Sequence, residues 1–341
     1  MSKKCVLSGY FGFKNFGDEA ILDVLVKKLQ NDNHNITVIS SNPEYTMSQY
    51  KEINSIYTFN IKEIIRTIFN SDIVISGGGS LLQDVTSAKS LYYYLFIIFM
   101  GLLFNKTVII FAQGIGPIQN PISRFIALQF IKHCKYVSVR DKNSYKLLTN
   151  SGIKADLLCD PIFSINIPGI ENKTKTVAVQ LRNCKGITAD FIDRLAHQIN
   201  IEFKDYKIEI YSFQDEIDLE ICKEFEKNIK MLNPDIKTEI FQGLTNSQII
   251  ERISQAEYMI AMRFHAIIIG LLTKTKILAI NYDIKVEKIA KEFGLPILNF
   301  NTEIKDAIAE LKSENSEAIT KQAKKKVFDW THFEEITNKE M

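Results

Sequence analysis

Apolar positions along the chain fall into short strand-like runs that alternate with helix-like segments. Residues 4–9 (KCVLSG) form a short apolar run, whereas residues 18–30 place Ile21 and Leu25 on one helical face, with Asp18 as the expected N-cap. Further strands are predicted at 36–40, 72–76, 107–112 and 136–140, and further helices near 61–69, 91–104 and 122–133. This alternation predicts a parallel sheet covered by helices on both faces.

The alternation stops at residues 164–176 (SINIPGIENKTKT), a polar segment without periodicity that contains Pro168 and Gly169. We expect an interdomain linker here. Strands resume at 176–181, 207–212, 257–262 and 276–280, and helices at 189–203, 216–230, 246–255, 265–272 and 285–293. The pattern predicts two doubly wound α/β domains around a cleft, at 1–165 and 176–310, and a C-terminal helix in 311–341 that could pack back across both.

Composition narrows the function classes. The chain has 341 residues and a formal net charge of +2, whereas a nucleic-acid-binding protein needs a strong basic excess. Five scattered cysteines without a CxxC pair predict reduced thiols and no zinc site, and no other metal is expected. With no secretory signal at the N-terminus, we expect a cytoplasmic protein.

Residues 91–104 (LYYYLFIIFMGLLF) carry no charge. The run is shorter than the roughly 20 residues that a spanning helix needs, so we interpret it as a core helix, with an interfacial segment as the alternative. The run Lys324–Lys326 is expected to be a solvated face, with contact to phospholipid as its alternative. Peripheral contact with a membrane is thus left open.

In a doubly wound sheet, ligands bind beyond the carboxyl ends of the strands. In the first half this rule selects the glycine-containing loop 9–18, the segment Gly77, Gly78, Gly79 and Ser80, then Gln113, and Arg140. Neither GxGxxG nor a P-loop is present, which argues against dinucleotide binding and ATP hydrolysis. The glycines allow either a tight turn or close approach of the backbone to a ligand.

In the second half the same rule selects Arg182, Arg263, His265 and Lys285. Arg263 and His265 lie between an apolar strand and an apolar helix, where helix amides and a cation together can hold an anion. This junction is the sharpest local signal in the sequence.

Seven motifs extend in order from about residue 5 to about residue 295 and read SGYFGFKNFGDEAIL, DIVISGGGSLLQDVTS, FAQGIGPI, VSVRD, CDPIF, MRFHAIIIG and NYDIKVEKIA. Together they resemble the polysaccharide pyruvyl transferase family, and most closely its bacterial cell-surface anchoring type. Individually weak, they are specific as an ordered set. Asn183-Cys184 departs from relatives that carry an aromatic in that region, and Ile284 stands where proline is common.

The resemblance implies a GT-B-like fold and an enzyme that transfers pyruvate from phosphoenolpyruvate to a sugar as a ketal. It further implies N-acetylmannosamine of a secondary cell-wall polysaccharide as acceptor, lipid-linked at the inner face of the membrane, and a product that anchors S-layer proteins. Phosphoenolpyruvate is then a co-substrate, and no cofactor is expected.

Phosphoenolpyruvate carries a phosphate and a carboxylate, which suit arginine and lysine. We therefore expect Arg140, Arg182, Arg263 and Lys285 to bind or activate it, and His265 to act as the acid. Asp18, Glu19 and Asp84 are candidate bases on the acceptor side, with Gly77, Gly78, Gly79, Ser80 and Gln113 beside them. Tyr92, Tyr93 and Tyr94 could stack on a sugar, although core packing is the expected role.

Two alternatives remain. A GT-B glycosyltransferase or nucleotide-sugar epimerase shares the architecture. Such enzymes usually bind the ribose of the nucleotide with a carboxylate in the second domain, whereas the strand ends of the second domain of this chain carry Arg, His and Lys. The second alternative is a non-catalytic polysaccharide-binding protein, but that function would not explain the cationic cluster at 263–265.

Overall fold

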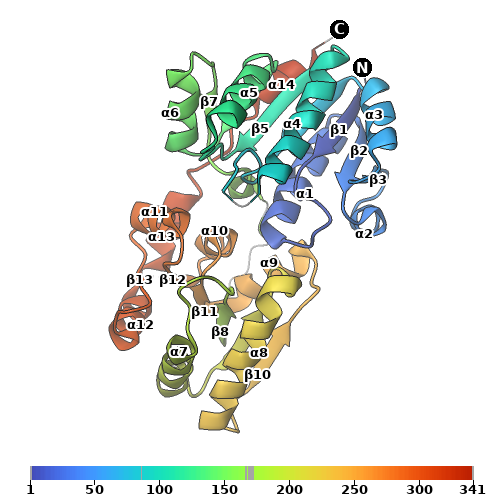
Figure 1. Ribbon diagram of the computed structural model, residues 1–341. Coiled ribbons are helices and arrows are strands. Elements are labelled where there is room, and N and C mark those ends of the chain that lie inside the picture. Colours follow the sequence, from blue (N-terminus) through green and yellow to red (C-terminus); the bar gives the residue numbers. More distant parts are fainter. Residues whose placement is uncertain (1, 86, 166, 168–172, 340–341) are drawn as a thin grey trace. The chain divides into compact units, whose positions relative to one another are not determined.

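A computed structural model describes residues 2–85, 87–165, 167 and 173–339. The chain divides into two compact units, one formed by residues 1–164 together with 327–341 and the other by residues 165–326. Each unit is built on its own parallel sheet with helices around it (Figure 1). The predicted α/β fold class, with two doubly wound parallel sheets, is confirmed.

The first sheet has seven strands in the order β3-β2-β1-β4-β5-β6-β7. Its strands are β1 (Lys4–Ser8), β2 (Asn35–Ser40), β3 (Asn54–Tyr57), β4 (Ile73–Gly77), β5 (Thr107–Gln113), β6 (Tyr136–Val139) and β7 (Asp156–Leu157). Its helices are α1 (Phe16–Asn31), α2 (Pro43–Gln49), α3 (Ile61–Phe69), α4 (Ala88–Leu103), α5 (Pro121–Lys132), α6 (Lys142–Asn150), η1 (Pro161–Ser164) and α14 (Thr331–Asn338). Central strands β1, β4 and β5 are buried along almost their whole length, as expected for a sheet covered on both faces.

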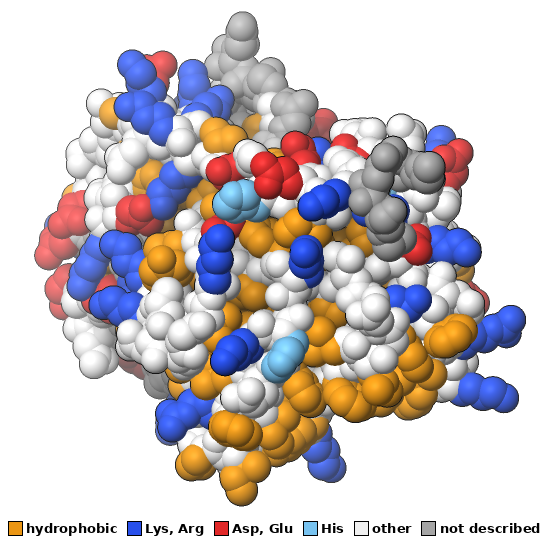
Figure 2. All heavy atoms as spheres, turned by 90° about the horizontal axis from the view of Figure 1, so that it is seen from above, with side chains coloured by type: hydrophobic (Ala, Val, Ile, Leu, Met, Phe, Trp, Pro, Cys, Tyr) orange, Lys and Arg blue, Asp and Glu red, His pale blue; other side chains and the backbone are white. Residues whose placement is uncertain are grey.

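Helices α3, α4 and α5 pack side by side against the first sheet (Figure 1). The apolar run 91–104 forms most of α4, and the side chains of Leu91, Leu95 and Ile98 are buried in the core. Core packing is therefore confirmed for one side of this helix. Its other side exposes aromatic residues, and Figure 2 shows hydrophobic side chains gathered along the lower edge of the face drawn there. No helix in the described part of the chain is both long and apolar enough to cross a membrane.

The second sheet has six strands in the order β10-β9-β8-β11-β12-β13. Its strands are β8 (Thr174–Gln180), β9 (Lys207–Tyr211), β10 (Thr238–Phe241), β11 (Ala256–Ala261), β12 (Lys276–Ile280) and β13 (Ile297–Leu298). Its helices are α7 (Ala189–Glu202), α8 (Asp215–Leu232), α9 (Asn246–Gln255), α10 (Phe264–Leu272), α11 (Ile284–Phe293), α12 (Ile304–Ser313) and α13 (Ser316–Ala323).

Two local predictions are corrected. Asp18 is not the N-cap of the first helix, because α1 begins at Phe16 and the side chain of Asn15 accepts a hydrogen bond from the Gly17 amide at 3.2 Å. The C-terminal segment is not one helix: residues 311–341 contain the end of α12, all of α13, and α14. Of the expected linker 164–176, residues 166 and 168–172 lie outside the described residues, and β8 already begins at Thr174.

Candidate functional site

Both sheets reverse their strand order at one point, and ligands bind at such switch points in doubly wound folds. In the first unit the reversal lies between β1 and β4, so loops 9–15 and 78–80 meet there. In the second unit it lies between β8 and β11, which brings residues 181–183 beside 262–263. The topology thus places the main predicted motifs of each unit at the carboxyl edge of its own sheet.

The glycine segment after β4 lies against the first turn of α1. Gly78 and Gly79 have φ angles of +69° and +68°, which side chains rarely adopt. A Cβ on Gly79 would lie 2.7 Å from Asp18 Oδ1, and one on Gly78 would lie 2.6 Å from Ile21 Cγ2. The glycines are therefore required for this close approach, which brings the Asp18 carboxylate to the edge of the sheet.

Arg140, which follows β6, forms an ion pair with Asp160 at 2.5 Å. Both side chains are nearly buried, and a second guanidinium nitrogen of Arg140 donates to Ser80 Oγ at 3.5 Å. Asp160 also accepts from the Ile162 amide at 3.0 Å. The charge of Arg140 is thus balanced within the first unit, and the pair ties together the motifs VSVRD and CDPIF.

The other two candidate bases are held differently from Asp18. Glu19 is buried and accepts a hydrogen bond from the Gly12 amide at 2.7 Å, and burial raises the pKa of its carboxyl to about 8. Asp84 accepts from the amides of Gln119 and Asn120 at 2.7 and 2.9 Å, and these two bonds lower its pKa. Glu19 is therefore mostly protonated at neutral pH, and Asp84 serves to hold a loop.

Gln113, at the end of β5, is fully buried. Its Nε2 donates to Ser76 Oγ at 2.8 Å, whereas its Oε1 has no hydrogen-bond partner among the described residues. A buried oxygen without a partner is costly, which agrees with a position beside a polar ligand.

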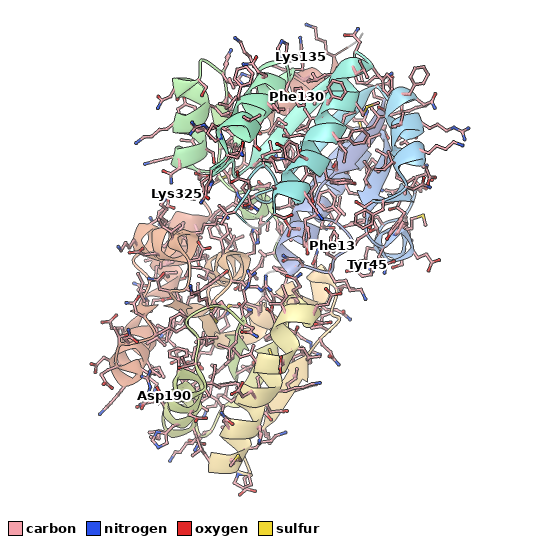
Figure 3. All side chains as sticks on the ribbon, viewed as in Figure 1. Phe13, Tyr45, Phe130, Lys135, Asp190 and Lys325 are labelled. Atoms are coloured by element: carbon pink, nitrogen blue, oxygen red, sulfur yellow. The ribbon has the colours of Figure 1, made fainter. Side chains whose placement is uncertain are left out.

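Aromatic side chains lie in the loop after β1 and on α4. Tyr10 and Phe13 stack at a centroid distance of 4.0 Å, and Figure 3 labels Phe13 in the first unit. Tyr94 is buried, while Tyr93 Oη lies 2.6 Å from Thr58 Oγ1. Core packing thus describes Tyr93 and Tyr94, and the Tyr10–Phe13 pair is the aromatic surface at the sheet edge.

In the second unit Arg263 is paired with a buried carboxylate. Its Nε and Nη2 donate to the two oxygens of Asp218 at 2.8 Å each, and Asp218 is fully buried. Asp218 also accepts from the Phe213 and Gln214 amides, while the Arg263 amide donates to Gln180 Oε1 at 2.8 Å. Arg263 is therefore fixed firmly at the start of α10, but its charge is largely compensated.

Arg182 lies at the same edge in a different environment. It donates to Tyr282 Oη at 3.4 Å, and its guanidinium carbon lies 5.8 Å from the centre of that ring. In the part of the chain that the structure describes, no carboxylate pairs with Arg182. Its positive charge is thus available to an anionic ligand.

His265 lies in the first turn of α10, whose N-cap residue Arg263 makes no side-chain capping hydrogen bond. Its ring is half-buried beside Phe264, at a centroid distance of 5.2 Å. Lys285 lies in the first turn of α11, the helix that follows the neighbouring strand β12 and packs against α10. Both residues therefore lie near positive helix ends at the carboxyl edge of the second sheet.

Sequence reasoning missed the acidic partners of two of the arginines. Asp160 could have been noticed, because it lies in the CDPIF motif, but nothing in the sequence marked Asp218 among the many charges of α8. Tyr282 was likewise passed over beside Lys285. In the described residues, no three His, Cys, Asp or Glu side chains cluster so that they could hold a metal ion.

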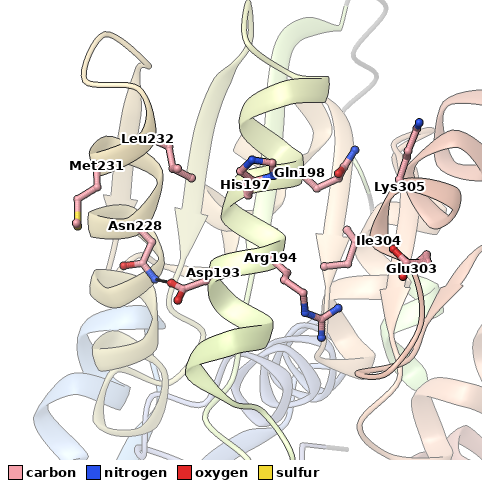
Figure 4. Close-up of a pocket in the computed structure, with 10 residues that line it drawn as sticks. All are labelled: Asp193, Arg194, His197, Gln198, Asn228, Met231, Leu232, Glu303, Ile304 and Lys305. Atoms are coloured by element: carbon pink, nitrogen blue, oxygen red, sulfur yellow. Dashed lines mark hydrogen bonds between the residues drawn. The ribbon is translucent and has the colours of Figure 1, made fainter.

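A cavity of about 440 Å³ lies elsewhere in the second unit, between α7, α8 and the start of α12 (Figure 4). It is lined by residues such as His197, Met231 and Lys305, and Asn228 donates to Asp193 at 2.5 Å across it. None of the predicted site residues lines this cavity, so it has no part in the candidate site.

Solved structures similar to this chain share its fold. The S. aureus MnaA–UDP complex has a TM-score of 0.65 at 10% identity, covering 98% of this chain and 97% of that one. A glycosyltransferase from Rickettsia africae has a TM-score of 0.62 at 15% sequence identity, and the match covers 100% of both chains. The UDP-GlcNAc 2-epimerase from Neisseria meningitidis bound to UDP-GlcNAc has a TM-score of 0.62 at 11% sequence identity, and the match covers 95% of this chain and 94% of that one. These likenesses show a GT-B-like fold.

No curated protein matches the sequence. The family model of the polysaccharide pyruvyl transferases, however, matches residues 15–284, which is most of the chain. This range begins just before Asp18, includes the glycine segment after β4 and the Arg263–His265 junction, and ends one residue before Lys285. The chain therefore belongs to the polysaccharide pyruvyl transferase family, and it is a transferase.

Proposed function

We propose that this enzyme transfers pyruvate from phosphoenolpyruvate, as a ketal, to a sugar of a secondary cell-wall polysaccharide precursor. The observation that supports this donor is the cationic edge at the switch point of the second sheet, where Arg182 follows β8 and His265 lies in the first turn of α10. Helix amides and an arginine suit a phosphate and a carboxylate on one small molecule. Phosphoenolpyruvate acts as a co-substrate, and the proposal needs no cofactor.

The proposed reaction forms two C–O bonds and breaks one. His265 gives a proton to the methylene carbon of phosphoenolpyruvate, which leaves a cationic centre at C2. Two sugar hydroxyls attack C2, each losing its proton, and the phosphate leaves with the bridging oxygen. Arg182 and Lys285 neutralise the anionic groups of the donor, while Asp218 acts as a positioning residue that holds Arg263.

Of the three candidate bases we favour Asp18 in the first unit. Glu19 is buried with a raised pKa, and Asp84 already accepts two backbone amides. Asp18 lies against Gly79 at the sheet edge, with the Tyr10–Phe13 stack in the preceding loop as a surface for a sugar ring. Arg140, paired with Asp160, supports Ser80 in the same loop region.

The acceptor is proposed from the resemblance to the anchoring type. That type implies N-acetylmannosamine, lipid-linked at the cytoplasmic face of the membrane, and a ketal that anchors S-layer proteins. The negative charge that the ketal adds suits a docking group for such proteins.

Turnover tests the proposal directly. The full chain is incubated with phosphoenolpyruvate and an N-acetylmannosaminide with free hydroxyls at carbons 4 and 6, and phosphate release and product mass are measured. We expect one phosphate per ketal, and a loss of about 10²- to 10⁴-fold in His265→Asn. The matched control His197→Asn, which lies in the separate cavity, should keep its activity. Near-normal turnover in His265→Asn would falsify the assigned acid.

Titration calorimetry separates this function from a nucleotide-sugar enzyme. We expect phosphoenolpyruvate to bind saturably, with an affinity about 10- to 100-fold lower in Arg182→Ala. Arg194→Ala, on the surface of α7, is the matched control. Arg182 is preferred to Arg263 for this test, because removing Arg263 leaves Asp218 as a buried unpaired charge. Saturable binding of UDP-N-acetylglucosamine, with none of phosphoenolpyruvate, contradicts the proposal and favours the glycosyltransferase or epimerase alternative.

A further inference from the structure

The solvent side of α4 is apolar, contrary to the usual pattern for a helix that covers a sheet. Its outward stripe runs through Lys89, Tyr92, Phe96, Phe99 and Leu103, at helical spacings of three and four. Tyr92, Phe99 and Leu103 are 46%, 40% and 58% exposed, although the opposite side of the helix fills the core. Large exposed patches of this kind mark interaction sites.

The neighbouring helices continue the apolar surface. On α5, Ile122 and Phe125 are 69% and 64% exposed, and on α3 Phe69 is 59% exposed. Ring contacts connect the helices, because Phe99 stacks on Phe130 at 5.5 Å and Phe69 meets Phe104 edge-on at 5.3 Å. We name this surface the α3–α5 face, defined by Phe69, Tyr92, Phe99, Leu103, Ile122 and Phe125.

The segments that form and join α4 and α5 are rich in positive charge. Between Asp84 and Asp141 the sequence contains no Asp or Glu, although the chain as a whole is nearly balanced. This stretch carries the cations Lys89, Lys106, Arg124, Lys132 and Lys135 besides the paired Arg140. Lys106 lies 5.7 Å from the ring centre of Phe69. Carboxylates do occur nearby, since Glu63 lies on α3 and Asp84 precedes α4.

We propose that the α3–α5 face docks onto an anionic lipid bilayer. Exposed aromatic and aliphatic side chains that enter the headgroup region, with lysines that meet anionic lipids, are the two contributions that hold peripheral proteins on membranes. Four of the five cations named above are lysines, which protein–protein interfaces disfavour, so the composition fits lipid better than a protein partner. By contrast, Lys326 in the C-terminal lysine run pairs with Glu292. This inference goes beyond the proposed function, because it concerns a surface and not the reaction.

Vesicle flotation tests the proposal with the full chain. We expect flotation with phosphatidylcholine vesicles that contain phosphatidylglycerol, little flotation with phosphatidylcholine alone, and weakening by salt. Ile122→Ser/Phe125→Ser and Arg124→Glu/Lys132→Glu should each reduce the bound fraction at least about tenfold. These side chains are exposed, so their replacement should leave the fold intact. The matched controls are Met231→Ser and Lys305→Glu in the second unit, which should bind like wild type.

Failure of wild type to float with anionic vesicles, or equal flotation of the α5 variants and their controls, overturns the proposal. The proposal is also overturned if Ile122→Ser/Phe125→Ser changes the oligomeric state, measured by light scattering, without losing vesicle binding. That result would identify the face as a protein interface. Phosphate release with the soluble acceptor should be unchanged in the α5 variants. The outcome for the membrane is therefore independent of the outcome for pyruvyl transfer.

Discussion

Asp218 and Arg263 form a bidentate ion pair in the interior of the second unit, with side chains that are 0% and 7% exposed. Such a pair contributes little net stability when intact, yet removing one partner leaves a buried charge uncompensated. The pair acts by positioning, because it fixes Arg263, the N-cap of α10, two positions before His265.

Asp218→Ala should lower the free energy of unfolding by about 3–5 kcal/mol, since it leaves the Arg263 guanidinium and two backbone amides without their acceptor. Urea unfolding followed by circular dichroism measures the loss. The exposed Glu220→Ala on the same helix is the control, with a change within about 0.5 kcal/mol. Asp218→Ala/Arg263→Met should recover part of the loss, and equal losses in single and double variants would argue against an unpaired charge.

Glu19 gives the first unit a dependence on pH. Burial raises its pKa from 4.5 to about 8, so the folded protein holds a proton that the unfolded chain releases. The contribution of the protonated Glu19 carboxyl to the free energy of unfolding is fully present below pH 4.5, and it falls as the pH rises toward 8. Glu19→Gln lacks this titration, so the variant should gain stability relative to wild type over that window, by at most about 1.4 kcal/mol per pH unit.

Urea unfolding of both proteins at about pH 5, 7 and 9, followed by Trp330 fluorescence, measures this difference. Burial also raises the pKa of Glu314 to about 7, but this residue lies in the second unit. It therefore contributes equally to the pH dependence of stability in wild type and in Glu19→Gln. A difference that stays constant with pH would show that Glu19 does not titrate within the window.

At the scale of elements, helix α14 and its N-cap residue Trp330 pack aromatic side chains onto the first sheet. Phe111 of β5 meets Trp330 and Phe333 at centroid distances of 5.4 and 5.3 Å, and Phe333 is fully buried. The C-terminal segment therefore completes the core of the first unit and is not a peripheral appendage.

Phe333→Ala should destabilise the first unit by about 3–5 kcal/mol, because it leaves a cavity between α14 and β5. Trp330 is the sole tryptophan of the chain and lies in this cluster, so its fluorescence reports unfolding of this unit. Val327→Ala, at a side chain 70% exposed, is the matched control and should change little. Equal midpoints for the two variants would mean that α14 is not part of the cooperative core.

Sequence patterns predicted the long buried elements and the short buried strand β6, and they failed for the edge strands. The helix near 61–69 corresponds to α3, because its apolar period is strong, and the strands at 107–112 and 276–280 correspond to β5 and β12, because each is a continuous apolar run. Edge strands β3, β7, β10 and β13 have two to four residues each and are only partly buried, so no apolar run marks them in the sequence. The strand-end rule also located the cations, but it could not reveal that Asp160 and Asp218 pair with two of them, since those contacts depend on tertiary packing.

At the scale of the whole molecule, the proposal assigns the donor to the second unit and the candidate base to the first. Phosphoenolpyruvate should therefore slow amide hydrogen exchange at residues 181–183 and 264–266, while residues 9–17 stay unchanged when no acceptor is present. Exchange monitored by mass spectrometry checks this, with Arg182→Ala as the variant that abolishes the protection. Protection confined to residues around Arg140 would instead move the donor site to the first unit.

The first unit is made from both ends of the chain, residues 1–164 and 327–341, whereas the second is one continuous stretch. During translation, the ribosome must therefore finish the whole second unit before it supplies the helix that closes the core of the first. Domains generally fold as they emerge, so a nascent chain holds an incomplete first unit, with Phe111 still uncovered, for the time needed to synthesise the stretch between them. A stop codon ahead of Thr331, where α14 begins, would thus damage the unit that was made first.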